Sequence, residues 1–269
     1  MRLIIVFPAY FWLLFAVAMV VSSIGFKKYV WFISLGYGFS IAAEGLAMLI
    51  LYGKTLSVGT VLCAALFVAY GCRLGGYLAV RELKSASYNK NMTGEIKEDV
   101  PFGVKIAIWV TCAVLYVLQV LPVFYRLYNQ AGSNVWTYVG AAVMAFGILF
   151  ESAADWQKNQ AKKVSPKRFV DTGLYRIVRC PNYLGEMIFW TGVVLSGIGG
   201  VSGVGQWVMA LIGYAGIIFV MFSGARRLEI RQNKNYGADP EYQHYVKTVP
   251  IMIPFLPLYS VEKYKWLVA

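Results

Sequence analysis

Long uncharged runs alternate with short charged segments along the whole chain. Seven of these runs are predicted to be membrane-spanning helices, at residues 3–26, 29–52, 56–80, 102–124, 134–152, 183–201 and 204–224. Each is close to or above the roughly 20 residues that a helix needs to cross the hydrocarbon core of a bilayer. The last two runs meet in a glycine-rich stretch at residues 197–205, which is either a tight turn or a re-entrant segment. The pattern predicts an all-α integral membrane protein with about seven transmembrane helices.

The composition supports this fold class. Of the 269 residues, 59 % are hydrophobic and 14 % are charged, whereas soluble domains average about 45–50 % apolar and about 25 % charged residues. No internal repeat or low-complexity linker divides the chain, so we expect a single membrane domain over residues 1–269. We expect a multi-pass protein of a bacterial inner membrane or of the endoplasmic reticulum.

The distribution of charge predicts the orientation of the chain in its membrane. The net charge is +12, and 21 of the 25 Lys and Arg residues lie in the loops at 27–28, 81–105 and 153–182 and beyond residue 225. The other side of the predicted membrane carries only Arg2, Lys54 and Arg126. By the positive-inside rule, the N-terminus faces outward and the C-terminus faces the cytoplasm.

The same charge also limits the classes of partner. Topology and attraction to anionic head groups of membrane lipids account for most of the excess of cations. A nucleic-acid partner is not expected, because nothing in the chain resembles a water-soluble fold with a basic patch. A metal site is not expected either, since the four cysteines and the single histidine have no metal-ligand spacing.

The first segment rich in polar chemistry spans residues 150–183. Glu151, Asp155, Lys158 and Lys162 are spaced by four, three and four residues, which places them on one face if the helix continues beyond the membrane. Opposite charges at this spacing stabilise a helix end. The two lysines alternatively form a pair of cations suited to binding phosphates.

The second such segment spans residues 223–259. We expect it to begin as a helix that ends at Gly237, and the Asp-Pro pair at 239–240 is expected to start a short helix carrying Tyr242 and Tyr245. Basic segments with tyrosines are common anchors at the membrane interface, and this explanation remains open. The charged residues of the first helix are Arg226, Arg227, Glu229, Arg231 and Lys234.

Two ionisable residues lie within the predicted membrane spans. Glu44 is in the second span, and Arg73 is in the third, one turn after Tyr70. Ionisable residues inside a membrane are functional candidates by default. The structural alternatives are a Glu44–Arg73 ion pair, or an Arg73 side chain that reaches the interface. A phosphate-binding cytoplasmic pocket and apolar helices together suit either hydride transfer or methyl transfer to a lipid-like molecule.

Three motifs carry a resemblance to a known family. GLYRIVRCPNYLGE (173–186) resembles the G-L-x-x-x-x-R-H-P-N-Y-x-G-E/D motif of the membrane reductases that include the steroid 5α-reductases and the sterol C14- and C7-reductases. QKNQAKK (157–163) resembles their cofactor segment, and residues 229–254 are similar to their C-terminus. The three motifs occur in family order and cover about residues 150–259.

This resemblance implies an NADPH-dependent reductase of a C=C bond conjugated to a carbonyl, with a steroid or sterol-like substrate. It implies that residues 1–149 are the substrate-side helices and that residues 150–269 bind NADPH. Lys158, Lys162 and Arg179 would meet phosphates, while Asn182 and Tyr183 would hold the adenosine or nicotinamide arm. The full set of cofactor residues is Asp155, Lys158, Lys162, Arg179, Asn182, Tyr183, Glu186, Glu229, Arg231, Lys234, Tyr236 and Tyr245.

The N-terminal half carries a fainter resemblance and two departures. AYGCRLGGYL (69–78) is similar to the third span of the steroid 5α-reductases, which implies that Tyr70 binds the substrate carbonyl and that Arg73 is a catalytic candidate. Glu44 is a third catalytic candidate because it is ionisable and lies inside a predicted span. Ser34 and Leu35 stand where that family has Gln-Glu, so the group that supplies the proton is left open. The motif's histidine is also replaced, by Cys180.

Two other classes of protein remain as alternatives. S-adenosylmethionine-dependent isoprenylcysteine or phospholipid methyltransferases share a related R-H-P-x-Y turn. They typically carry a Glu-Glu pair before the tail helix, where this chain has RRLEIRQ (226–232). The remaining alternative is a non-enzymatic lipid-binding or scaffold protein, in which the polar clusters act only as interface anchors.

Overall fold

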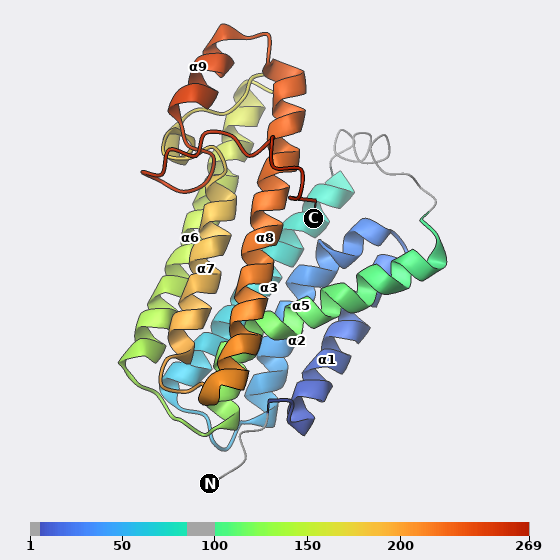
Figure 1. The fold of residues 1–269 in the computed structure, drawn as a ribbon, viewed down its shortest axis with the longest axis vertical. Coiled ribbons are helices and arrows are strands. Elements are labelled where there is room, and N and C mark those ends of the chain that lie inside the picture. Colours follow the sequence, from blue (N-terminus) through green and yellow to red (C-terminus); the bar gives the residue numbers. More distant parts are fainter. Residues whose placement is uncertain (1–5, 85–99, 269) are drawn as a thin grey trace. The chain divides into compact units, whose positions relative to one another are not determined.

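The computed structural model describes residues 6–84 and 100–268, and every regular element in those ranges is a helix (Figure 1). The predicted all-α class is therefore confirmed. The longer helices are α1 (Ala9–Ser22), α2 (Leu35–Leu51), α3 (Val58–Lys84), α5 (Phe102–Tyr128), α6 (Val135–Val164), α7 (Pro181–Gly197), α8 (Gly203–Tyr236) and α9 (Pro240–Thr248). Three short 3₁₀ helices are η1 (Ser23–Phe26), η2 (Tyr29–Phe32) and η3 (Gly173–Arg176).

Six stretches of helix in the described ranges are long and apolar enough to cross a membrane: Ala9–Phe26, Tyr29–Leu51, Val58–Glu82, Phe102–Tyr128, Val135–Val164 and Gly203–Tyr236. The chain is therefore built as a multi-pass membrane protein. The other predicted span corresponds to α7, which is apolar but has only 17 residues. The exact number of crossings and the orientation of the termini remain predictions. Most of the basic loop predicted at 81–105, and the start of the first span at 3–5, lie outside the described residues.

The chain forms two compact units. Unit 1 comprises Met1–Ala141 and Val193–Tyr214, and unit 2 comprises Ala142–Gly192 and Ala215–Ala269. The boundary near residue 142 is close to the predicted division between substrate-side and cofactor-side halves at residue 150. Residues 193–214, which include the turn between α7 and α8, nevertheless belong to unit 1.

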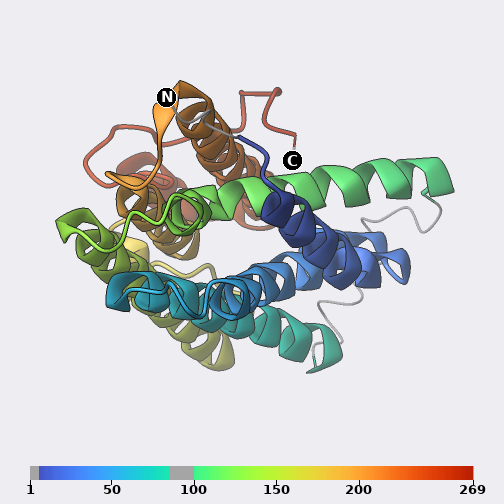
Figure 2. The ribbon, with the colours of Figure 1, turned by 90° about the horizontal axis from the view of Figure 1, so that it is seen from below.

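In unit 1, α2 and α3 pack closely through glycines and lie side by side in both views (Figures 1 and 2). A Cβ atom added to Gly38 would lie 2.7 Å from the backbone nitrogen of Gly75. A Cβ atom added to Gly45 would lie 2.8 Å from the carbonyl oxygen of Ala64. Small residues of this kind let the backbones of membrane helices approach each other, and the gain in van der Waals contact drives their association.

Arg126 has a structural role that its position in the sequence does not reveal. The pattern of charges places it in an outer loop, but it is fully buried at the end of α5. Its guanidinium donates hydrogen bonds to the carbonyl oxygens of Ser196 (2.8 Å), Ile198 (2.5 Å) and Gly132 (2.5 Å). The Ser196 carbonyl is in the last turn of α7, and the Ile198 carbonyl follows directly after the helix. The last carbonyls of a helix have no partner within the helix, and Arg126 supplies one here.

The glycine-rich stretch at 197–205 is a tight turn and contains no re-entrant helix. α7 ends at Gly197 and α8 begins at Gly203. Gly199 and Gly203 have φ angles of +78° and +69°, which glycine adopts without the steric penalty of a Cβ atom. Arg126 and this turn therefore form one hydrogen-bonded corner of unit 1.

Unit 2 combines most of α6 and α7 and the second part of α8 with α9 and a tail. A Cβ atom added to Gly185 of α7 would lie 2.7 Å from the backbone nitrogen of Glu151 in α6, so these two helices are in close contact. As predicted, α8 ends at Tyr236, just before Gly237, and α9 begins at Pro240. The Asp239 side chain caps α9 by accepting a hydrogen bond from the Glu241 backbone N–H at 2.9 Å.

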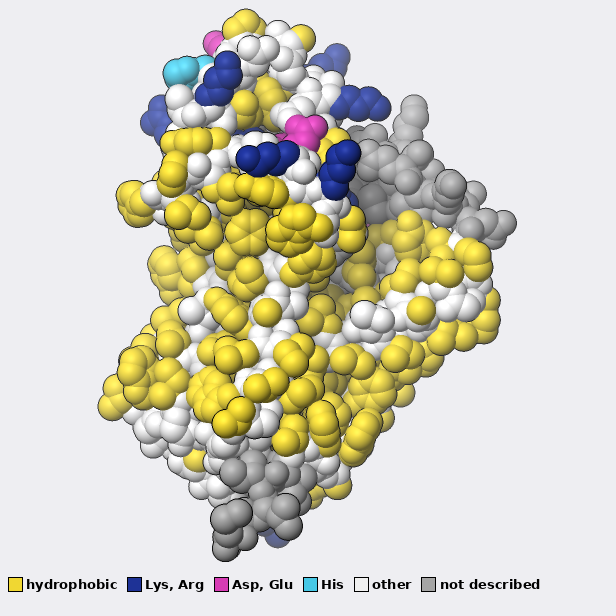
Figure 3. Space-filling view, viewed as in Figure 1, with side chains coloured by type: hydrophobic (Ala, Val, Ile, Leu, Met, Phe, Trp, Pro, Cys, Tyr) yellow, Lys and Arg dark blue, Asp and Glu magenta, His cyan; other side chains and the backbone are white. Residues whose placement is uncertain are grey.

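The surface of unit 2 reflects this division between membrane and polar chemistry. Hydrophobic side chains cover much of the visible face, and most of the visible Lys and Arg side chains gather around α9 and the neighbouring end of α8 (Figure 3). Beneath α9 lies a buried aromatic cluster of Phe169, Tyr242 and Tyr245, with Tyr236 packed against it. The rings of Phe169 and Tyr245 are stacked, with their centroids 5.4 Å apart.

Candidate functional site

The turn that precedes α7 is held by the C-terminal tail. The backbone N–H groups of Arg179 and Cys180 donate hydrogen bonds to the carbonyl oxygens of Pro250 and Ile251, both at 2.9 Å. The predicted cofactor motif and the segment after α9 are therefore one structure, although some 70 residues separate them in the chain. All the residues of this region belong to unit 2.

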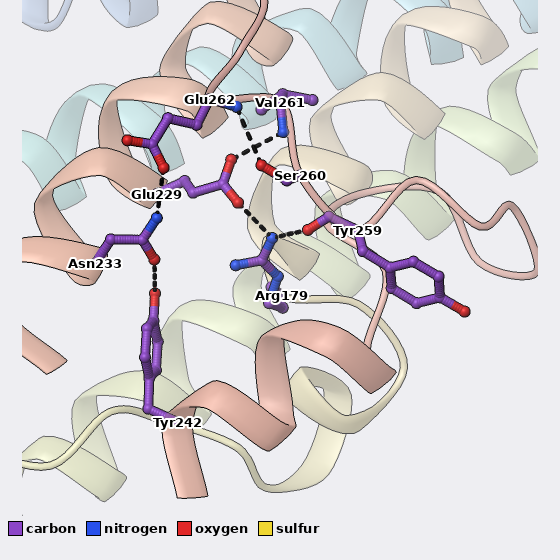
Figure 4. Close-up of polar contacts among 8 residues, drawn as sticks. All are labelled: Arg179, Glu229, Asn233, Tyr242, Tyr259, Ser260, Val261 and Glu262. Atoms are coloured by element: carbon purple, nitrogen blue, oxygen red, sulfur yellow. Dashed lines mark hydrogen bonds and ion pairs between the residues drawn. The ribbon is translucent and has the colours of Figure 1, made fainter. Parts of the chain in front are cut away.

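The Arg179 side chain forms a buried clasp between this turn, α8 and the tail (Figure 4). Its Nη2 donates to Glu229 Oε1 at 2.9 Å and also to the carbonyl oxygen of Tyr259. The other carboxylate oxygen of Glu229 accepts a hydrogen bond from the Val261 backbone N–H at 2.9 Å. The Arg179 and Glu229 side chains are only 1 % and 3 % exposed. Removing either partner of such a buried pair strongly destabilises the folded protein.

Two donor atoms of the Arg179 guanidinium have no hydrogen-bond partner among the described residues. They are Nε and Nη1, and both are buried. Buried donors normally have partners, and a donor without one carries the full cost of its lost hydration. The two N–H groups point in different directions, so an anionic oxygen at either of them would satisfy that donor with a charge-assisted hydrogen bond.

Further cations lie around the same turn. The charge of Lys158, on α6, acts on the Cys180 thiol, and the charges of Arg227 and Arg231, on α8, act on the Tyr183 hydroxyl. Burial raises the pKa of Cys180 to about 12, against the opposing effect of Arg179 and Lys158. Cys180 is thus a neutral, buried thiol beside positive charges. Helices α6 and α8 and the turn before α7 all contribute to this group of cations.

A second polar chain joins α8, α9 and the tail in the same region (Figure 4). The Tyr242 hydroxyl donates to Asn233 Oδ1 at 2.8 Å, and Asn233 Nδ2 donates to Glu262 Oε2 at 2.6 Å. Burial raises the pKa of Tyr242 to about 12, so the phenol keeps its proton and remains a donor at neutral pH. This chain of contacts fixes α9 against the last turns of α8.

Three of the predicted cofactor residues make structural contacts. Lys162 donates to the carbonyl oxygens of Arg168 (2.5 Å) and Pro166 (3.2 Å) and to the Tyr236 hydroxyl (3.1 Å). These contacts engage all three donors of its ammonium group and close the loop after α6. The Tyr245 hydroxyl donates to the carbonyl oxygen of Tyr175 at 2.7 Å. Of the two lysines predicted to bind phosphates, Lys162 therefore makes contacts within the protein, and its role toward a cofactor stays a prediction.

The other predicted residues differ in exposure. Asp155 on α6 and Glu186 on α7 are buried, and Asn182 and Tyr183 are half-buried at the start of α7. Arg231 and Lys234 are exposed on α8. The structure thus brings Arg179, Tyr183, Glu186, Glu229 and Arg231 to one region. In the parts of the chain that the structure describes, no three His, Cys, Asp or Glu side chains gather as metal ligands would.

The three catalytic candidates lie in unit 1. Tyr70 is fully buried, and its hydroxyl is 2.9 Å from the hydroxyl of Tyr37. Glu44 is also fully buried, and neither of its carboxyl oxygens has a hydrogen-bond partner in the described ranges. The Glu44–Arg73 ion pair that the sequence allowed is therefore not formed. The Arg73 guanidinium instead lies 5.7 Å from the centre of the Tyr77 ring.

Several residues of these sites were not predicted from the sequence. Arg227 precedes Arg231 by four residues and so shares its helix face, a spacing that was visible in the sequence. Tyr37 precedes Tyr70 by 33 residues, and nothing in the spacing of the two tyrosines predicts that their hydroxyls meet. The same holds for Asn233, whose partners come from α9 and the tail.

Two surface cavities flank the site in unit 2. One, of about 320 Å³, is lined by Arg176, Ile177, Pro250, Pro254, Phe255, Leu256, Pro257 and Tyr259. The other, of about 730 Å³, is lined by Arg168, Asp171, Arg176, Pro240, Glu241, His244, Tyr245, Thr248 and Val249. The cations of the second cavity are partly neutralised, because Arg168 forms ion pairs with Asp171 (2.7 Å) and Glu241 (2.8 Å).

Comparison with known proteins places the chain in a family without assigning it an activity. No curated protein and no solved structure matches the chain. A family model with the description "Protein of unknown function (DUF1295)" matches residues 14–249. Because this match covers most of the 269 residues, the chain belongs to the DUF1295 family.

Proposed function

We propose that the protein is an NADPH-dependent membrane reductase of a C=C bond conjugated to a carbonyl in a hydrophobic substrate. A 3-oxo-Δ4-steroid is the substrate class that fits the motif resemblance best. The observation that carries the proposal is the buried Arg179 guanidinium, whose Nε and Nη1 donors have no partner in the described ranges. It lies in the very turn that resembles the reductase motif.

The residues of unit 2 fit a phosphorylated dinucleotide. The unpartnered Nε and Nη1 donors of Arg179 and the charges of Lys158, Arg227 and Arg231 favour the phosphates, because hydrogen bonds from cationic donors to phosphate oxygens are strong. Half-buried Tyr183 offers an aromatic face and a hydroxyl to the adenosine or nicotinamide arm. The cofactor, when bound, would supply a hydride. The protein's part is to hold the phosphates and orient the ring.

The tyrosines of unit 1 fit the substrate side of the reaction. In the proposed mechanism, the Tyr70 hydroxyl donates a hydrogen bond to the substrate carbonyl and stabilises the negative charge that develops on its oxygen. Tyr37, 2.9 Å away, orients the Tyr70 hydroxyl in the absence of the carboxylate that the steroid 5α-reductases have in place of Leu35. Glu44 is a further candidate proton donor, because its carboxyl group has no partner in the described ranges.

Ligand-induced thermal stabilisation of the detergent-purified protein tests the cofactor assignment. NADPH, NADH and S-adenosylhomocysteine are compared side by side, and NADPH alone is expected to raise the unfolding temperature. A ligand that binds only the folded state adds about 2.7 kcal/mol at 100 times its Kd. A shift with S-adenosylhomocysteine alone would instead identify a methyltransferase, and no shift with any of the three would exclude both enzymes.

A matched pair of variants locates the site. Arg231→Ala is expected to weaken NADPH binding about tenfold or more, since loss of one charge-assisted hydrogen bond costs about 1.5–3 kcal/mol. Lys247→Ala removes another exposed cation, on α9, and is expected to leave NADPH affinity unchanged. Equal effects of the two variants would contradict the site. With an enone substrate, Tyr70→Phe is expected to slow NADPH oxidation without changing NADPH affinity.

A further inference from the structure

The C-terminal tail, residues 249–268, carries an exposed apolar tip at residues 253–257. The backbone N–H of Ile251 donates to the carbonyl oxygen of Leu258 at 2.8 Å and closes the loop between them. Phe255, at the apex, has a φ angle of +65° and is fully exposed. A bulky residue with a left-handed backbone is rare and strained. Two prolines, Pro254 and Pro257, stiffen the loop on either side of it.

The apolar tip, residues 253–257, is unfavourable in water. Phe255 exposes its whole side chain, and Leu256 is 48 % exposed. Ile177, which lines the cavity of about 320 Å³ together with Phe255 and Leu256, is 46 % exposed. Contiguous apolar surface of this kind on an ordered loop is characteristic of contact with a membrane or with another protein.

The tail is attached where the apolar parts of α7 and α8 end toward the polar region of unit 2. Its residues 250 and 251 accept hydrogen bonds from the turn at residues 179–180. The apolar part of α7 begins shortly after this turn, at residue 183. The Arg226 Nε donates to the carbonyl oxygen of Glu262 at 3.0 Å, and Arg226 immediately follows the apolar part of α8. Trp266 stacks on Phe219, with ring centroids 6.2 Å apart, and Phe219 lies within that apolar part. Trp is enriched where a membrane meets water.

A cation, Arg176, lies beside the tip. Arg176 lines the 320 Å³ cavity together with Ile177, Pro250, Tyr259 and the residues of the tip. Its side chain is exposed at the end of the short helix η3. An apolar surface beside an arginine is complementary to a lipid, because the apolar side chains can contact the acyl chains while the arginine contacts the anionic phosphate.

We propose that the apolar tip inserts into the head-group region of the bilayer and that Arg176 binds a lipid phosphate there. A lipid fits the tip better than a second copy of the chain does, because Arg176 beside the tip complements an anionic phosphate and Trp266 of the same tail stacks on Phe219 in the apolar part of α8. The tip thereby anchors the tail, which presents the Tyr259 carbonyl to Arg179 and the Val261 N–H to Glu229. This inference does not rest on the proposed reductase activity.

Spin labelling of the full chain in lipid nanodiscs tests the insertion. A label is attached at Phe255→Cys in a Cys72→Ser background, because Cys72 is an exposed native thiol whereas Cys63, Cys112 and Cys180 are buried. Collision with oxygen, which concentrates in the bilayer, is compared with collision with a nickel chelate, which stays in water. The nanodiscs contain phosphatidylcholine and phosphatidylglycerol.

The label at residue 255 is expected to show an oxygen-to-nickel collision ratio several-fold above that of a Glu262→Cys control, which lies exposed on the same tail. A ratio equal to the control would place the tip in water and overturn the proposal. Low collision with both reagents would also overturn it, because a protein surface would then cover the tip. A label at Leu256→Cys repeats the measurement with Phe255 intact.

The Arg176 contact is tested in detergent without any label. Phosphatidylglycerol is expected to raise the unfolding temperature of the wild type more than phosphatidylcholine does. Arg176→Gln is expected to lose this difference, and Lys247→Gln, an exposed cation on α9, is expected to keep it. Equal loss in both variants, or in neither, would overturn the assignment of the phosphate to Arg176.

Discussion

The buried clasp between Arg179 and Glu229 makes a quantitative prediction for Glu229→Ala. The change removes the acceptor of two hydrogen bonds of 2.9 Å, from Arg179 and from the Val261 N–H. It also leaves the Arg179 charge buried with one carbonyl partner, that of Tyr259. Removing one member of a buried ion pair costs about 3–5 kcal/mol. At about 2–4 °C per kcal/mol for a chain of this size, the expected fall in unfolding temperature is about 6–20 °C.

The assay is thermal unfolding of the purified protein in detergent, without ligand. Two comparisons separate the clasp from a general effect of substitution. The double variant Arg179→Met/Glu229→Leu is expected to recover much of the loss, because no buried charge remains unpaired. Glu241→Ala breaks an ion pair with Arg168 in which the glutamate is 70 % exposed, and is expected to cost about 0–1 kcal/mol. A fall of less than about 2 °C for Glu229→Ala would refute the reasoning, since it corresponds to under about 1 kcal/mol.

Two further predictions concern packing and ionisation. Gly71→Val is expected to destabilise unit 1 by several kcal/mol, because even a Cβ atom there would lie 2.5 Å from the Ala42 backbone nitrogen and overlap the Gly38 carbonyl; unchanged thermal unfolding would contradict the close helix contact. Cys180 is expected to resist alkylation up to about pH 10 in the folded protein, with the denatured protein as the control, because burial raises its pKa to about 12. The unfolded chain releases this proton first, near pH 8.5, so the contribution of Cys180 to stability falls as the pH rises from about 8.5 toward 12.

The helices of this protein could be predicted from the sequence because the bilayer offers the backbone no hydrogen-bond partner. An uncharged run of sufficient length must then satisfy its own N–H and C=O groups. The ends of α8 and α9 followed from local chemistry as well, through Gly237 after α8 and the Asp239 cap with Pro240 at the start of α9. The concentration of cations near Arg179 was also visible, since a residue's charge does not depend on its neighbours.

The roles of individual polar side chains depended on the tertiary structure. Arg126 and Arg179 both follow apolar sequence, yet one closes the α7–α8 turn and the other joins the turn before α7 to the tail. Lys162 has the spacing of a phosphate ligand along its helix, but its donors are engaged by the following loop and by Tyr236. Spacing along a helix predicts which face a residue occupies, but not what that face meets.

The sequence by itself therefore determined the class of fold, the positions of most spans and the region in which polar chemistry gathers. Only the tertiary structure decided that Tyr37 meets Tyr70, that Glu44 lacks a partner in the described ranges and that Glu229 holds Arg179. The physical reason is that helix formation satisfies the backbone locally. Contacts between side chains of different helices depend instead on the rotation and depth of each helix, which small residues such as Gly38 and Gly45 set by close packing.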